Sequence, residues 1–205
     1  MKILLDMKLI NRIIFLLILI FSLQSWTKAD DISDFEIEGM SVGDSLFNFF
    51  DNEKINNSIV NWYDHLEKNK YISFAFDSNK FEFYDFVDVW TKYGDNEYKI
   101  YAIAGVIYFG KNKPIKDIND CYYQQTSISN DLMQIFSNAE KSGPHKTIYY
   151  NADPTGKSSY TDIYLYLVND YEAVIACYDW NEDLEQKKDH LYIGLRTETF
   201  NQWLD

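Results

Sequence analysis

Residues 160–178 have the sequence YTDIYLYLVNDYEAVIACY, and this stretch decides the fold more than any other part of the chain. Two runs rich in aromatic and β-branched residues, 160–168 and 171–178, flank the dipeptide Asn169-Asp170. Such runs favour β-strands, and a polar pair between them has the spacing of a tight hairpin. We therefore expect an antiparallel sheet built around this hairpin.

Further strands are predicted on both sides of the hairpin. Several segments show the period-2 pattern of a strand, in which alternate residues are apolar. In residues 98–109 both alternating sets are apolar, which indicates a central strand covered on both faces. The other predicted strands or extended segments are 71–76, 80–84, 87–93, 146–150 and 189–196, the last with Leu191, Ile193 and Leu195 on one face.

Helical periodicity is clearest in residues 118–139, and Gly143-Pro144 is expected to stop this helix. Shorter helices are predicted over residues 42–50 and immediately after Thr197, because polar residues that can cap the first turn precede each of them. Residues 53–67 also have helical spacing, although their Asn and Ser residues are poor helix formers. Together these elements predict an α+β fold: a mainly antiparallel sheet, one long helix packed on a face, and short N- and C-terminal helices.

The first 29 residues have the pattern of a secretory signal peptide. A positively charged start precedes the apolar stretch 13–23, and Thr27-Lys28-Ala29 offers small residues for cleavage after Ala29. An uncleaved membrane anchor is the alternative, if the apolar stretch is counted from Leu9. Cleavage predicts a single α+β domain over residues 30–205, located in the periplasm or outside the cell and without a stable membrane span.

The chain has two cysteines, Cys121 and Cys177. An even pair in an exported protein favours a disulfide, which in this chain would tie the long helix to the late hairpin. Two buried thiols are the alternative. A metal site is not expected, because His65, His145 and His190 are scattered and no zinc-type spacing is present.

The predicted mature chain is strongly acidic. The net charge of −13 includes +3 from the first 29 residues, so residues 30–205 carry −16. Arg196 is the single arginine of that part. Binding to phosphates requires clustered Lys and Arg, so nucleic acid and anionic membranes are poor candidate partners, whereas cationic partners and divalent ions remain open.

Several motifs suggest specific chemistry, but none is complete. The stretch 153–158 contains Gly-Lys-Ser, yet the first glycine of a phosphate loop is missing and a polar turn is the better interpretation. The spacing Gly-x-Ser-x-Gly occurs at residues 39–43, but no strand is predicted directly before it, so a nucleophile elbow is not expected there. Two groups of carboxylates could bind a cation weakly or could simply be solvated: Glu82, Asp85 and Asp88, and Asp179, Glu182, Asp183 and Glu185.

Aromatic residues in the predicted strands offer another possible site. They could line one sheet face and stack on sugars or apolar ligands, or they could pack on one another across strands. The residues concerned are Tyr84, Trp90, Tyr164, Tyr166 and Tyr178.

Three stretches, 34–45, 177–180 and 191–204, resemble small exported proteins of AT-rich marine bacteria that are uncharacterised, and the resemblance implies no activity. The helix start at Gly39-Met40-Ser41 is similar to the SmpA/OmlA envelope proteins, which implies a small α+β fold involved in outer-membrane assembly.

We expect an exported acidic binding module, or an envelope interaction module, without a catalytic site or cofactor. Its partner is expected to be a protein or a small-molecule ligand. One alternative is a secreted carboxylate-dependent hydrolase, which requires two carboxyl groups converging in a cleft, one with a raised pKa. Another is a periplasmic solute-binding module, which requires an apolar pocket edged by aromatic residues.

Overall fold

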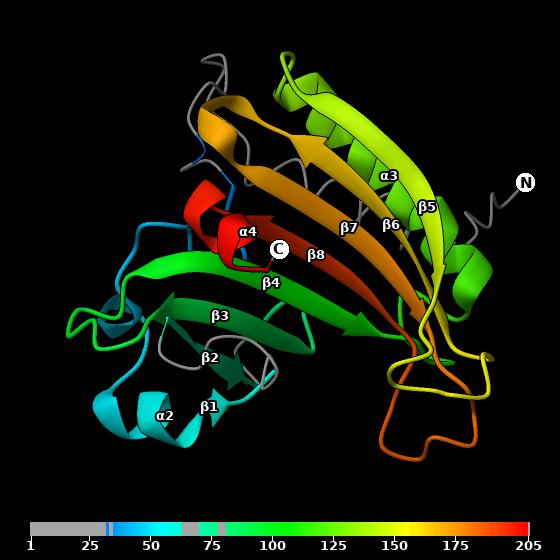
Figure 1. The fold of residues 1–205 in the computed structure, drawn as a ribbon, viewed down its shortest axis with the longest axis horizontal. Coiled ribbons are helices and arrows are strands. Elements are labelled where there is room, and N and C mark those ends of the chain that lie inside the picture. Colours follow the sequence, from blue (N-terminus) through cyan, green and yellow to red (C-terminus); the bar gives the residue numbers. More distant parts are fainter. Residues whose placement is uncertain (1–31, 33–34, 63–69, 78–80, 205) are drawn as a thin grey trace, which may run out of the picture.

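The computed structural model describes residue 32 and residues 35–62, 70–77 and 81–204 (Figure 1). Eight strands form one sheet in the order β1-β2-β3-β4-β8-β7-β6-β5, and every neighbouring pair is antiparallel. The strands are β1 (Ile59–Val60), β2 (Tyr71–Phe76), β3 (Phe86–Lys92), β4 (Ile100–Tyr108), β5 (Glu140–Ile148), β6 (Ser159–Tyr166), β7 (Glu172–Asp179) and β8 (His190–Arg196). The predicted α+β class with a large antiparallel sheet is confirmed.

The sheet consists of two four-stranded meanders joined by one helix. Strands β1–β4 follow one another across the first half, and β5–β8 follow one another across the second. Helix α3 (Ile118–Ile135) leads from the central strand β4 to the outer strand β5. The chain then returns strand by strand until β8 pairs with β4, so β4 is central, as its two apolar faces predicted.

Helix α3 begins where its sequence predicts, because the Asp117 carboxylate accepts hydrogen bonds from the amides of Asn119 and Asp120. It packs across β6, β7 and β8. Cys121 forms the expected disulfide with Cys177 on β7. One turn later the buried Gln125 donates from Nε2 to the carbonyl oxygens of Thr161 and Ile175, both at 2.7 Å.

The two faces of the sheet carry separate apolar cores. The α3 face packs against α3 and the segment 35–50, and it includes Leu191, Ile193 and Leu195, as their alternation predicted. The opposite face packs against α4 (Glu198–Leu204) through Phe200 and Trp203, and we call it the α4 face. Thr197 caps α4 by accepting from the Phe200 amide.

The predicted helix over residues 42–50 is wrong. Only a short 3-10 helix, η2 (Leu46–Asn48), forms there, and Gly43 has a φ of 98° that a helix does not allow. Asp51 then caps α2 (Asn52–Asn57). The predicted helix 53–67 therefore ends early, and its residues 63–69 lie outside the described part of the chain.

The predicted strand 80–84 is also wrong where the structure describes it. The amides of Glu82, Phe83 and Tyr84 donate instead to the Glu38 carboxylate, at 2.9, 2.8 and 3.0 Å. Three consecutive amides directed at one carboxylate form an anion-binding turn rather than a strand. The Glu38 side chain thus fixes this loop against the N-terminal segment.

Strand β5 differs from its prediction in both extent and position. It begins at Glu140 and includes Gly143-Pro144, whereas the prediction placed a strand only at 146–150. A proline is tolerated here because β5 is an edge strand, and its register with β6 shifts between Ser142 and His145. Helix α3 accordingly ends at Ile135, with Phe136 as its C-cap, four residues before the predicted end.

The loop between β6 and β7 is one residue longer than predicted. The Leu167 amide donates to the Tyr171 carbonyl, which leaves the three residues of η3 (Val168–Asp170) in the loop. Asn169 and Asp170 both have positive φ, near 60°. This conformation suits Asn and Asp, so the polar pair still directs the turn.

The predicted signal peptide, residues 1–29, lies outside the described part of the chain. Among the helices that the structure does describe, none combines the length and the apolar character needed to cross a bilayer.

Candidate ligand-binding site

Four aromatic rings gather on the α4 face where β5, β6 and β7 meet their loops. Tyr160 and Tyr178 lie opposite each other on β6 and β7, with ring centroids 5.4 Å apart. Trp180 follows at 5.9 Å from Tyr178, and Tyr149 completes the set at 5.2 Å from Trp180 and 5.7 Å from Tyr160. We call Tyr149, Tyr160, Tyr178 and Trp180 the four-ring cluster.

A histidine extends this cluster toward the centre of the sheet. His190 on β8 stacks on Tyr178 with centroids 4.5 Å apart, and Tyr108 on β4 meets its ring edge-on at 6.1 Å. Burial lowers the pKa of His190 to about 4, so the imidazole is neutral at pH 7. Its Nδ1 lies 2.7 Å from the Lys188 carbonyl oxygen and donates to it.

Two lysines of the β7–β8 loop lie over rings of this surface. The Lys187 ammonium is 5.0 Å from the centroid of Trp180, and the Lys188 ammonium is 5.2 Å from that of Tyr108. Both distances fall within the range of cation–π attraction. Rings of this face therefore already contact cationic groups that belong to the chain itself.

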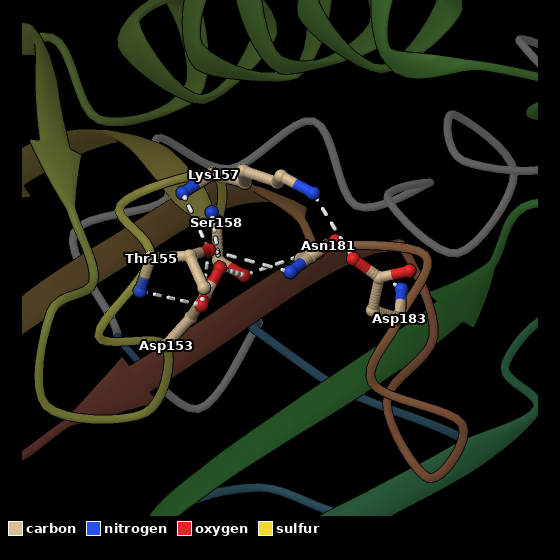
Figure 2. A network of polar contacts seen from close by, with 6 residues as sticks. All are labelled: Asp153, Thr155, Lys157, Ser158, Asn181 and Asp183. Atoms are coloured by element: carbon tan, nitrogen blue, oxygen red, sulfur yellow. Dashed lines mark hydrogen bonds and ion pairs between the residues drawn. The ribbon is translucent and has the colours of Figure 1, made fainter.

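One buried carboxylate organises the loop that follows Tyr149 (Figure 2). Asp153 Oδ1 accepts from the amide and the hydroxyl of Thr155, and Oδ2 accepts from the amide and the hydroxyl of Ser158, all at 2.6–3.0 Å. These bonds, that from the Thr155 hydroxyl first, hold the pKa of Asp153 well below its usual range.

The same network reaches the next loop. The Asn181 amide donates to the Ser158 hydroxyl at 2.9 Å, and the Asn181 side chain donates to Thr155 at 3.4 Å. Lys157 pairs with Asp183 at 3.0 Å on the exposed side (Figure 2). Because Asn181 directly follows Trp180, the network fixes the backbone next to that ring. The stretch 153–158 is therefore a structural turn. This confirms its interpretation as a polar turn.

Buried polar groups continue the α4 face toward its centre. Arg196 pairs with Glu172 at 3.4 Å, and both side chains are largely buried. The Tyr192 ring lies over Gly194. A Cβ added at Gly194 would be 2.9 Å from Cε1 of Tyr192. Burial raises the pKa of Tyr192, so its hydroxyl remains protonated.

Two carboxyl groups on this face have raised pKa values. Burial raises the pKa of Asp88 to about 7, against the lowering effect of the hydrogen bond from Trp62 Nε1 at 2.6 Å. Asp162 also has a raised pKa because of burial; Tyr164 donates to its Oδ2, and Oδ1 has no partner among the described atoms.

These two carboxyl groups do not form a catalytic pair. They lie on β3 and β6, with β4, β8 and β7 between them. Four strand spacings separate their backbones by about 19 Å. Carboxyl pairs that cleave glycosidic bonds are about 5–10 Å apart, so this separation does not favour a hydrolase that would use both groups.

The aromatic residues predicted to share one face are divided between both. Trp90, Tyr164 and Tyr178 belong to the α4 face, where Trp90 packs beneath Phe200. Tyr84 packs in the core of the α3 face, and its ring occupies the space that a Cβ on Gly105 would need. Tyr166 is about half exposed, and it lies opposite Glu172.

The carboxylates predicted as possible cation ligands have separate roles. Asp85 accepts from the Tyr108 amide and pairs with Lys113, while Asp88 accepts from Trp62. In the later group, Asp183 pairs with Lys157. Across the part of the chain that the structure describes, no cluster of three or more His, Cys, Asp or Glu side chains could hold a metal ion.

Tyr149, Tyr160, Trp180 and His190 were not predicted as members of the site. Their only signal was position: Tyr160 begins a predicted strand, and Tyr149 and His190 lie next to the ends of two others. No family model matches the chain, and neither a curated protein nor a solved structure is a match to it.

Proposed function

We propose that the protein is an exported binding module that holds a small-molecule ligand on the α4 face beside the four-ring cluster, without catalysing a reaction. The observation that carries this proposal is the partly exposed set of rings over β5–β8. The one long helix, α3, packs on the other face, and α4 packs near β4. The rings of the second meander therefore remain at the surface.

The geometry of this surface supports binding rather than catalysis. The Asp153 network holds two loops in fixed positions, and stacked rings need little reorganisation when a ligand arrives. Large half-buried rings also provide contact area at a small entropic cost. The carboxyl groups of Asp88 and Asp162, both with raised pKa values, lie too far apart to act together on one bond.

The leader pattern and the disulfide support the proposed export. A disulfide between Cys121 and Cys177 persists in an oxidising compartment. The acidic character of residues 30–205 disfavours nucleic acid as the partner.

A ligand panel tests the proposed function. The mature chain is titrated with representatives of four classes, namely neutral sugars, alkylammonium compounds, dicarboxylates and fatty acids, and binding is measured by calorimetry. At least one class is expected to bind, and Trp180→Leu is expected to abolish that binding. The control is Tyr123→Leu, an exposed aromatic residue on α3, which should leave affinity unchanged. Binding that survives Trp180→Leu, or no binding by any class, would contradict the proposal.

A further inference from the structure

The Lys187 ammonium group lies over Trp180, the ring type that attracts cations most strongly. Lys187 is exposed and belongs to the loop that connects β7 to β8. Its ammonium is held there by the ring. An exposed lysine side chain is free to leave, so a ligand cation of higher affinity can take the same ring face.

The four-ring cluster supplies more than one ring for such a cation. Its four ring contacts form a closed circuit, with neighbouring centroids 5.2–5.9 Å apart. The Tyr149 ring is tilted by 36° from Trp180 and by 75° from Tyr160, whereas the Tyr178 ring is nearly parallel to Trp180, at 12°. Aromatic ring faces are the surfaces on which proteins bind quaternary ammonium groups.

Charge complementarity favours a cation over an anion at this end of the sheet. Residues 30–205 carry a net charge of −16, and the pKa of Asp189 is raised by burial and also by repulsion from Asp179 and Glu182. Arg196, the single arginine of residues 30–205, lies on β8 and pairs with Glu172. An anionic ligand would meet repulsion here, whereas a cation would be attracted.

We infer that the four-ring cluster binds a methylated ammonium compound, and that Lys187 covers the Trp180 ring until this ligand displaces it. The inference rests on the proposed function and names the ligand class for the same site. A primary ammonium is strongly hydrated, so placing it against a ring costs desolvation. Methyl groups reduce that hydration and add apolar contact with the rings, which is why the methylated cation displaces the lysine.

Calorimetry with choline and its neutral isostere 3,3-dimethylbutan-1-ol tests the inference, because the two differ in charge but hardly in shape. Choline is expected to bind the mature chain about ten-fold more tightly than the isostere. Trp180→Leu should abolish choline binding. Lys187→Met removes the competing ammonium without altering a ring, and it should tighten choline binding several-fold. Tyr123→Leu on α3 is the matched control and should change nothing.

Equal affinity for choline and the isostere would overturn the inference, as would a Lys187→Met variant that binds choline no more tightly than the parent. If Trp180→Leu does not fold, the Lys187→Met result decides alone. Binding of an oligolysine peptide without binding of choline would assign the surface to a basic chain and reject the small ligand. If choline fails while another class binds through Trp180, the proposed function stands and only this inference falls.

Discussion

Asp88 shows at the residue scale how burial controls ionisation. Its carboxyl group is only 7% exposed, and its pKa is about 7 in the folded chain. In the unfolded chain the group ionises near pH 4, so between about pH 4 and pH 7 the unfolded state releases a proton that the folded state keeps. The folded state therefore loses stability as the pH rises through that window.

Asp88→Asn removes this cost while keeping an acceptor for Trp62 Nε1. We expect the variant to be more stable than the parent by on the order of 3 kcal/mol at pH 8, and nearly unchanged at pH 4. Urea unfolding at both pH values measures the difference. A stability gain of the same size at both pH values would show that ionisation is not its cause.

The carboxylate of Glu38 accepts hydrogen bonds from three consecutive amides, and it thereby holds the loop that contains them. We expect Glu38→Ala to lower the free energy of unfolding by about 2 kcal/mol, because three amides lose a charged acceptor. Hydrogen exchange at residues 82–84 should accelerate. The exposed neighbour Glu36 provides the control, and equal effects of Glu36→Ala and Glu38→Ala would refute this role.

Single residues of the core were predictable, whereas long-range polar contacts were not. The alternation of Leu191, Ile193 and Leu195 places them on one face whatever their neighbours are. Glu38 contacts amides that follow it by 44 to 46 residues, and no local pattern connects the two segments. The network of Asp153 is intermediate, since its partners Thr155 and Ser158 are close in sequence, whereas Asn181, which donates to Ser158, is not.

At the scale of elements, the disulfide joins α3 to β7 across 56 positions of sequence. In the chain-entropy model, a loop of that length stabilises the folded state by about 4 kcal/mol. We expect the double variant Cys121→Ala/Cys177→Ala to lose about that much in urea unfolding at pH 7. Reduction of the parent chain should have a similar effect, and a loss below about 1 kcal/mol in both cases would contradict the account.

The two loops at the four-ring cluster form another unit at this scale. Asp153→Asn replaces an acceptor of four hydrogen bonds by an amide that cannot accept them all. We expect faster hydrogen exchange throughout residues 181–189 and a red shift of Trp180 emission. Lys157→Gln removes only the exposed ion pair and should leave both signals unchanged. An unaltered exchange rate in Asp153→Asn would exclude coupling between the loops.

Strands with at least one buried face were predicted well, and the exposed strand was not. Strands β2, β3, β7 and β8 lie within one residue of their predicted bounds, because their apolar residues follow the period of a strand. Strand β5 is exposed along almost its whole length and therefore has no such pattern. Residues 42–50 have helical spacing, yet their apolar side chains reach the core from a turn and a 3-10 helix.

The whole molecule depends on pairings that the sequence does not encode locally. In this strand order β4 pairs with β8, which follows it by about 90 residues in the sequence. The chain between them first passes through α3 to the outer edge of the sheet. The site depends on register in the same way. A two-residue loop would place Tyr160 opposite Asp179, whereas the observed three-residue loop places it opposite Tyr178. A shift of one residue in the register of β6 with β7 would therefore separate Tyr160 from Tyr178 and disrupt the four-ring cluster.

We expect ligand to contact the α4 face at Trp180, and fluorine NMR of residues 30–205 with 5-fluorotryptophan at their four tryptophans measures this contact. The resonances of Trp62, Trp90, Trp180 and Trp203 are assigned by single substitutions, and the spectrum is followed while each member of the ligand panel is added. We expect the Trp180 resonance to shift with a saturating ligand, while Trp62, at the far end of the sheet, stays constant. Saturable shifts at Trp62 without any at Trp180, or a spectrum that no ligand changes, would contradict the account.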